Sequence, residues 1–337
     1  MITRLAMASH MPELKTKRMT PTRIMKRPIL LPFFILLSAQ IAQTQVVNTE
    51  RVIQPQNATV KGPVKSIRIS SYLNMGDQDA VVKYNEFPLF DFRYDEAGNL
   101  LEEVRYETDG HPYQKTTYER SADGLLQKSV ETDLDNNRQA ITTYSPDGSF
   151  QVAYLDTAGN IQEFQEVHFN PGEKTELFRK TDGSIAWGIK YKLDEHGNAI
   201  QQKEFFDEEE MNAEDGYELI HRYTYNASGQ VTEQLSLDDG EFVGKEVFIY
   251  DGLGHLVETT FFYQQPGKLS FQKTYRYNDH GDVSEWTWDN KESYAIFFQK
   301  TNYEYVYDGF GNWILRHSLK DGFSGWTVER KMEYWKE

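Results

Sequence analysis

The feature that most constrains this chain is a nine-residue string that returns along most of its length. The string is YVYDGFGNW at residues 305–313 and recurs as FRYDEAGNL, YTYNASGQV, FIYDGLGHL and YRYNDHGDV. With degenerate copies included, its glycine occupies nine positions: Gly98, Gly124, Gly148, Gly172, Gly197, Gly229, Gly254, Gly281 and Gly311. Successive glycines are 24 to 32 residues apart. Such near-constant spacing is typical of a repeat architecture built from one supersecondary unit.

Each position of the string has a physical role in a tight β-hairpin turn. An Asp or Asn opens the turn, where its side chain accepts hydrogen bonds from backbone amides further on. A glycine at the fourth turn position supplies the left-handed conformation that closes a type I turn with a bulge. The repeat-turn residues predicted in this way are Asp95, Gly98, Gly148, Gly197, Asn226, Gly229, Asp251, Gly254, Asn278, Gly281, Asp308 and Gly311.

The residues between the turns alternate between apolar and polar with a period of two. Phe90, Phe92 and Tyr94 share one face of their strand, whereas Asp91 and Arg93 share the other. This pattern is typical of antiparallel strands buried on one side. Nine turns imply about eighteen strands, and open sheets rarely exceed about ten strands without curling. We therefore predict an all-β fold: a long antiparallel sheet of about nine repeated hairpins, wound into a spiral or shell-like array with its aromatic face inward.

The two ends of such an array need protection, because a free strand edge invites aggregation. Residues 60–87 lack the turn string, and we expect them to form N-terminal capping strands ahead of a repeat domain at residues 88–337. The charged segment VERKMEYWKE suits a terminal edge strand. The longest gap between turns contains FFDEEEMNAEDGYE (205–218), which we expect to be an extended, solvated acidic hairpin loop.

The amino-terminal stretch differs from the repeats. A basic Met-Lys-Arg precedes PILLPFFILLSAQIA, a short apolar run that ends in small residues, and this is the layout of a secretory signal peptide. A membrane anchor and a buried helix are the alternatives, but the run is too short to span a bilayer. Cleavage is expected at Ala39 or Ala42. The predicted boundaries are a mis-called extension at 1–24, the signal peptide at 25–42 and a linker at 43–59.

Net charge and the absence of cysteine exclude several kinds of partner and of chemistry. The formal net charge is −16, and removal of residues 1–42, with seven basic side chains and one acidic side chain, leaves −22. So acidic a surface repels phosphate backbones, which disfavours nucleic acid as a partner. The chain has no cysteine, which excludes disulfides, thiolate chemistry and lipid attachment to a cysteine. We expect a secreted or periplasmic protein that is not embedded in a membrane.

The repeat resembles that of the YD-repeat, or Rhs-type, proteins of bacteria. The segments RYDEAGNLLEE, TYNASGQVTEQ, IYDGLGHLVET and VYDGFGNWILR carry the resemblance, which covers about residues 88 to 335. It implies a wound β-sheet that serves as a scaffold or binding surface. Large members of the family enclose a toxin, but this chain is too short to do so and has no toxin domain after its repeats. Its closing stretch is also similar to the ends of small exported repeat proteins of Bacteroidetes.

Motifs of the common catalytic classes are missing from the sequence. It contains no Gly-x-Ser-x-Gly elbow, no phosphate-binding loop and no His-Glu-x-x-His. Acids are so numerous, at 52 Asp and Glu, that pairs at glycosidase spacing are expected by accident. Stacked turns could align His255 with His280, or turn carboxylates into a calcium ladder, but turn capping explains these residues. We therefore predict no catalytic residue, no cofactor and no metal site.

One pair of residues stands out as a candidate for ligand binding. Trp286 and Trp288, in SEWTWDN, occupy one face of a predicted strand, and Trp187 lies in SIAWGIKYK. Aromatic platforms commonly hold sugars or peptides, although core packing is the alternative. An outer-membrane barrel is disfavoured, because one face of the strands is Lys, Arg, Glu and Thr.

The predicted function is that of an exported, non-enzymatic β-repeat scaffold that binds a protein or a carbohydrate at the cell envelope. Two alternatives stay open. One is a hydrolase that acts on polysaccharide, with acids lining the interior of the wound sheet. The other is an accessory component of an Rhs-like toxin or secretion locus.

Overall fold

The computed structural model describes residues 60–74, 83–213, 219–263, 267–291, 297–320 and 323–336. All of them belong to one compact unit that comprises residues 40–337. The predicted extension, signal peptide and linker lie outside the described residues. Within the described part of the chain, no helix has the length and apolar character that a membrane span needs.

The described residues form twenty strands and one short helix, α1 (Glu208–Asn212). The strands are β1 (Val64–Asn74), β2 (Lys83–Tyr94), β3 (Leu100–Tyr106), β4 (Pro112–Arg120), β5 (Leu126–Asp133), β6 (Arg138–Tyr144), β7 (Phe150–Leu155), β8 (Ile161–Asn170), β9 (Glu173–Lys180), β10 (Ile185–Leu193), β11 (Ala199–Phe205), β12 (Leu219–Tyr225), β13 (Val231–Asp238), β14 (Glu241–Tyr250), β15 (Leu256–Tyr263), β16 (Leu269–Tyr277), β17 (Val283–Asn290), β18 (Phe297–Tyr307), β19 (Trp313–Lys320) and β20 (Phe323–Tyr334).

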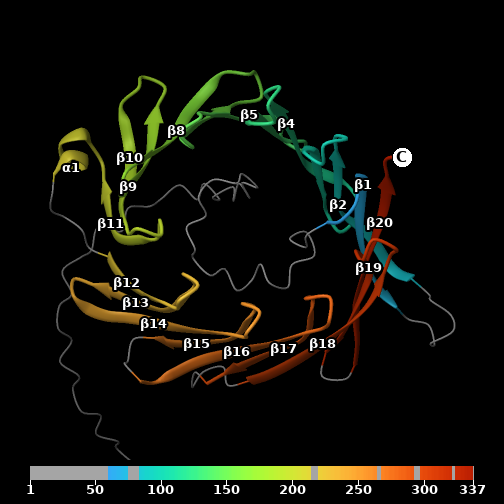
Figure 1. Ribbon diagram of the computed structural model, residues 1–337. Helices are drawn as coiled ribbons and strands as arrows, with labels where there is room; N and C mark the ends of the chain where they lie inside the picture. Colours follow the sequence, from blue (N-terminus) through green and yellow to red (C-terminus); the bar gives the residue numbers. More distant parts are fainter. Residues whose placement is uncertain are drawn as a thin grey trace, which may run out of the picture. The chain divides into compact units, whose positions relative to one another are not determined.

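These strands form one antiparallel sheet in which each strand pairs with the next one along the chain. The sheet closes on itself, because β20 pairs with β1 as well as with β19. In the closing ladder, Ile67 lies opposite Met332 and Ile69 lies opposite Arg330. Figure 1 shows the strands following one another around this closed β-barrel.

Closure corrects two predictions, the spiral of about eighteen strands and the charged terminal edge strand. A spiral leaves two strands with unpaired backbone groups, whereas joining β1 to β20 pairs both. The cap segment contributes the long strand β1 to this seam. A buried apolar cluster stabilises the seam: Val64, Ile67, Ile69, Phe92, Trp313 and Val328.

All nine repeat glycines lie in connections that lead from an even-numbered strand to the next strand. Alternate connections of an antiparallel meander fall at the same end of the sheet. We call this end the repeat-turn end and the opposite one the far end. Each of these glycines has a positive φ, for example +82° at Gly98 and +79° at Gly311. In the last repeat turn, Asp308 N donates to Asn312 O at 2.9 Å and Gly311 N donates to Asp308 O at 3.1 Å.

Tyrosines at the ends of several strands link their hairpin to the turn of the hairpin before it. Tyr307 donates a hydrogen bond to Asp282 Oδ2 at 2.8 Å and accepts one from Asn278 Nδ2 at 2.8 Å, and both partners belong to the preceding turn. Tyr334 makes the equivalent contact with Asp308 one repeat later. The tyrosine of the repeated string therefore belongs to the strand of its own hairpin and also stabilises the contact with the neighbouring hairpin.

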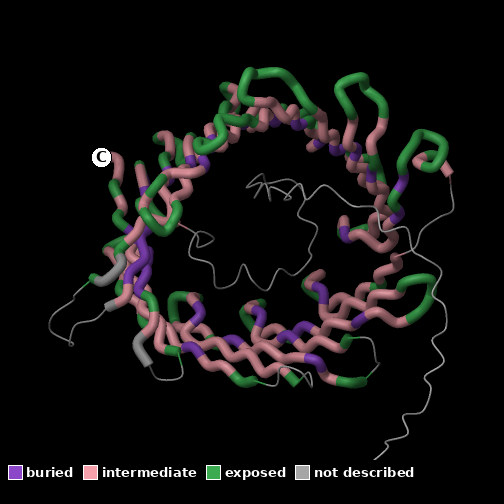
Figure 2. Tube along the Cα trace, turned by 180° about the vertical axis from the view of Figure 1, so that it is seen from behind, coloured by how far each residue is buried: buried purple, intermediate pink, exposed green. Residues whose placement is uncertain are grey.

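The two faces of the sheet differ in burial. Cross-strand partners share a face, so parity can be followed strand by strand around the closed ladder. The face that carries Phe92, Val152, Phe248 and Trp313 holds most of the deeply buried side chains, as expected for the concave side of a closed sheet. We call it the inner face. Figure 2 shows buried positions along the strands and exposed positions concentrated in the connections.

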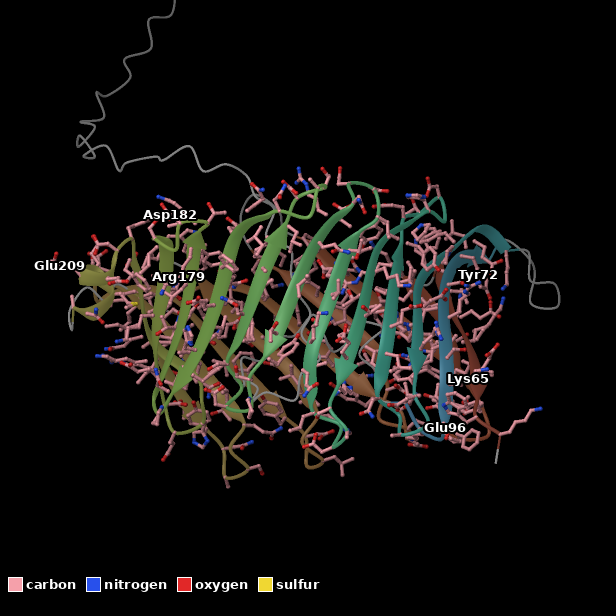
Figure 3. All side chains as sticks on the ribbon, turned by 90° about the horizontal axis from the view of Figure 1, so that it is seen from above. Lys65, Tyr72, Glu96, Arg179, Asp182 and Glu209 are labelled. Carbon is pink, nitrogen blue, oxygen red and sulfur yellow. The ribbon has the colours of Figure 1, made fainter. Side chains whose placement is uncertain are left out.

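The segment at 205–218 departs from the predicted extended loop, because its first part is helical. Asp207 caps α1, and its Oδ1 accepts a hydrogen bond from Glu210 N at 2.8 Å. Three acids in the first turn interact favourably with the helix N-terminus. Figure 3 labels Glu209 of this helix, together with Arg179 and Asp182 near β9. Residues 214–218 lie outside the described residues.

Candidate ligand-binding site

Strand β17 places both predicted ligand-binding tryptophans on the inner face. Trp286 lies opposite Tyr275 and Trp288 lies opposite Lys273 in the ladder with β16. The centroids of the two indole rings are 6.3 Å apart. The alternating residue Glu285 faces outward, where it forms ion pairs with basic side chains of β16 and β18. Period-two alternation in SEWTWDN places the two indoles on one face, and the register shift beside Tyr277 makes that face the inner one.

Three phenylalanines extend this aromatic surface over the neighbouring strands. The rings of Phe261 on β15 and Phe271 on β16 stack with centroids 4.9 Å apart. The ring of Phe297 on β18 meets that of Trp288 edge-on at 4.8 Å and remains 37% exposed. We call Phe261, Phe271, Trp286, Trp288 and Phe297 the aromatic patch.

Sequence reasoning missed the three phenylalanines, although strand parity contains a signal for two of them. Phe271 and Phe297 stand an even number of positions before the repeat tyrosines Tyr277 and Tyr307, so they share the face of those tyrosines. Phe261 follows a register shift in the β14–β15 ladder, which changes the parity. Parity counted from the turn alone would have placed it on the wrong face.

Polar groups lie at the border of the aromatic patch. Lys273 Nζ is 5.6 Å from the ring centroids of both Phe271 and Trp288, which is within cation–π range. Burial raises the pKa of Glu246, which lies opposite Phe261, and Lys273 counteracts that rise. Trp288 Nε1 is buried and has no hydrogen-bond partner among the described residues. A buried donor without a partner is costly, so a ligand acceptor at this position would be stabilising.

This arrangement is suited to binding. Flat aromatic faces carry a negative quadrupole that attracts the weakly positive C–H groups of a sugar ring, and the nearby ammonium and indole N–H can hold hydroxyl oxygens. In the part of the chain that the structure describes, no three His, Asp or Glu side chains come together in the manner of a metal site.

The histidines at the repeat turns stack on tyrosines and do not converge on one another. The ring of His255 lies on that of Tyr277 with centroids 4.6 Å apart, and the ring of His280 lies on that of Tyr307 at 3.8 Å. The turn carboxylates cap the backbone: Asp251 Oδ1 accepts a hydrogen bond from His255 N at 2.9 Å. These local contacts explain why histidines and aspartates occur at the repeat turns.

No protein-family model matches the sequence, and no curated protein is similar to it. A porin-like protein from Bacteroides uniformis matches with a TM-score of 0.31 and 11% identity, covering 81% of this chain and 99% of that chain. The Tc holotoxin pore of Photorhabdus luminescens matches with a TM-score of 0.30 and 12% identity, covering 71% of this chain. The TcdB2-TccC3-TEV structure matches with a TM-score of 0.30 and 13% identity, again over 71% of this chain.

The chain spans 16% of the length of the two toxin chains that it matches. Because these TM-scores lie near 0.3, neither function nor family follows from them. The resemblance of the repeated string to YD-repeat proteins therefore stays a prediction.

Proposed function

We propose that this chain is an exported, non-enzymatic β-barrel that binds a neutral glycan at the cell envelope through the aromatic patch. The observation that carries the proposal is the aromatic patch on the inner face of β15 to β18, in which Lys273 lies between the Phe261–Phe271 stack and the tryptophans. The N–H of Trp288 in this patch has no partner among the described residues. A core aromatic cluster would be expected to bury all of its rings, whereas Phe297 remains 37% exposed.

A glycan is favoured over the other macromolecular ligands. An extended peptide binds most readily by adding a strand to a long free sheet edge. Every described strand has a ladder partner on both sides, and the one short ladder is that of β11 and β12, which pair only at Gln201–Ile220 and Gln202–Leu219. A net charge of −16 opposes binding of nucleic acid. Sugars need neither a strand edge nor a basic surface, because stacking and hydrogen bonds to hydroxyl groups are sufficient.

We propose that the barrel is surrounded by water and not by a lipid bilayer. A membrane barrel needs an apolar band on its outer face. Here the outer face carries ion pairs between neighbouring strands at 2.6 to 2.8 Å. These pairs are Arg68–Asp91, Lys115–Glu102, Lys245–Glu233 and Lys300–Glu285. The exported protein is therefore expected to purify as a monodisperse species without detergent.

The test compares two adjacent phenylalanines on opposite faces. Phe297 belongs to the patch, whereas Phe298 lies opposite Asp289 on the outer face and is 60% exposed. Binding of residues 43–337 to a glycan array identifies a ligand, and titration calorimetry then measures its Kd. Phe297→Ala and Trp288→Ala should each weaken binding by about 1–2 kcal/mol, and Phe298→Ala should leave it unchanged. Equal affinities for all four proteins, or no array binding, would contradict the proposal.

A polysaccharide hydrolase is the second candidate, favoured by buried inner-face acids. Burial raises the pKa of Glu131 and of Glu163, which suits a carboxyl that must donate a proton near neutral pH. Release of reducing ends from the bound glycan, abolished by Glu131→Gln, would favour this candidate over the binding module.

An accessory role in a toxin or secretion locus rests on the resemblance of the repeats alone. Co-purification with products of neighbouring genes would test it. Such a partner would be expected to contact the barrel whether or not the aromatic patch is intact.

A further inference from the structure

A second aromatic surface lies on the inner face, away from the aromatic patch. The rings of Phe178 on β9 and Trp187 on β10 are stacked with centroids 4.1 Å apart and an angle of 9° between their planes. The two residues lie opposite each other in the ladder, and Trp187 is 37% exposed. Phe178 therefore supports one face of the indole and leaves a flat surface accessible. We call this pair the second platform.

The second platform and the aromatic patch lie at the same end of the barrel. Trp187 lies near the start of β10 and Trp288 near the end of β17, and both positions adjoin far-end connections. Seven strand steps separate β10 from β17, which at about 4.8 Å per step is an arc of roughly 34 Å along the sheet. One sugar ring cannot contact both surfaces.

Hydrogen-bonding side chains lie on the inner face between the two aromatic surfaces, alongside the acids Glu204 and Glu246. His221 Nδ1 lies 2.9 Å from Ser236 Oγ and 3.4 Å from Gln234 Nε2. Burial lowers the pKa of His221, so its imidazole is neutral near pH 7 and can both donate and accept. Gly244 lies opposite Ser236 and leaves room for the ring of Phe261, which is 3.4 Å from the place of a Cβ at Gly244.

Each aromatic surface has a lysine beside it with an acidic neighbour, and the exposed Glu204, opposite Ile189, adds a further acid beside the second platform. Lys174 Nζ and Glu176 Oε1, next to the second platform, are 2.6 Å apart. Lys273 at the patch lies close enough to Glu246 to oppose part of the rise that burial causes in the pKa of that carboxyl. Acidic neighbours beside these lysines disfavour an anionic ligand, so an uncharged ligand is favoured over an acidic one.

We infer that the aromatic patch and the second platform are two subsites of one site, and that its ligand is a linear, neutral oligosaccharide running along the inner face from Trp288 to Trp187. The inference rests on the proposed function. Sugar rings stack at both ends of the site, and His221, Ser236 and Gln234 hold hydroxyl groups between them. The affinity should therefore rise with chain length until both platforms are engaged.

The experiment measures Kd for size-graded fragments of the neutral polysaccharide that the wild-type protein binds on the array. For wild type and Phe298→Ala, affinity should increase over the whole series. For Trp187→Ala, the increase should stop at shorter fragments, with the longest binding about tenfold more weakly than to wild type. Trp187→Phe should restore part of this loss. Circular dichroism of each variant checks that the barrel has folded, and Trp187→Phe serves as the test if Trp187→Ala does not fold.

The outcomes separate the two proposals. If Trp288→Ala weakens binding while Trp187→Ala and Trp187→Phe follow wild type at every length, the second subsite is wrong and the proposed function stands. If Trp288→Ala also binds like wild type, the proposed function fails as well. A ligand that proves to be a peptide, or an affinity that does not depend on chain length, would overturn the inference.

Discussion

Two glycines in the last repeat turn show how narrowly a single residue is constrained. Gly309 and Gly311 are two positions apart in YDGFGN, yet only Gly311 has a positive φ, at +79°. A residue with a Cβ is unfavourable in that conformation, while Gly309 has ordinary backbone geometry and open space around its Cα. The position within the turn therefore determines whether glycine is required: position 311 requires it, and position 309 does not.

Gly311→Ala should destabilise the barrel by about 1–2 kcal/mol, because the left-handed conformation is strained for an L-residue. Gly309→Ala is the matched control and should have little effect. Urea denaturation followed by circular dichroism measures both. Equal losses of stability would show that the turn does not depend on a left-handed residue at position 311.

Tyrosines provide a prediction of pH dependence. Burial raises the pKa of Tyr94, Tyr154 and Tyr223 to about 12 each in the folded protein. A phenol whose folded pKa exceeds its unfolded value of about 10 contributes stability that is fully present below pH 10. This stability is lost as the pH rises from about 10 to 12. The Tm should be flat up to pH 10 and fall above it, with tyrosinate absorbance rising in the same interval; a fall that begins near pH 8 would disagree.

Close packing between strands is the main constraint at the scale of elements. Phe205 at the end of β11 is fully buried, and its ring occupies the space where Gly188 on β10 has no side chain. A Cβ at Gly188 would lie 2.3 Å from Phe205 Cζ and 2.7 Å from Glu176 O. A glycine inside a strand often marks such a close approach, but it does not tell which side chain fills the space.

Gly188→Ala should destabilise the barrel by about 1–3 kcal/mol, because both Phe205 and the β9 backbone would have to move. Gly252→Ala is the control, since nothing lies within 4 Å of a Cβ at that position. Thermal melts compare the two. A Tm for Gly188→Ala equal to that of the control would mean that β10 and β11 are less tightly packed than described.

Closure is the property that belongs to the whole molecule. Trp335 N donates to Pro63 O at 2.8 Å, and the side chain of Asn312 donates to Lys61 O at 2.8 Å, so both ends of the described strand order meet at the repeat-turn end. These contacts take the place of the turn that every other pair of strands at this end possesses. Strand β1 thereby completes the last repeat, although it lies more than two hundred residues away from it.

A circular permutant tests closure directly. Joining residue 336 to residue 60 through a short flexible linker and opening the chain in the far-end turn at Gly183 should give a folded barrel, because the joined ends are already adjacent. Opening the chain between Val247 and Phe248, inside β14, is the control and should prevent folding. Circular dichroism and size-exclusion chromatography measure both. In a spiral the joined ends would be far apart, and the first permutant would then fail like the control.

The sequence alone determined the features that depend on neighbours along the chain. Turn positions, strand alternation and the placement of Trp286 and Trp288 on one shared face follow from glycine stereochemistry and period-two geometry, which act over a few residues. That this shared face is the inner one depends on the register shift beside Tyr277 in the β16–β17 ladder. Only the tertiary structure decided that β1 closes the sheet against β20, and that Phe261, Phe271 and Phe297 join the tryptophans. Closure and the composition of the aromatic patch depend on the register between distant segments and on bulges that shift parity. No local sequence pattern specifies which distant strand pairs with a free edge.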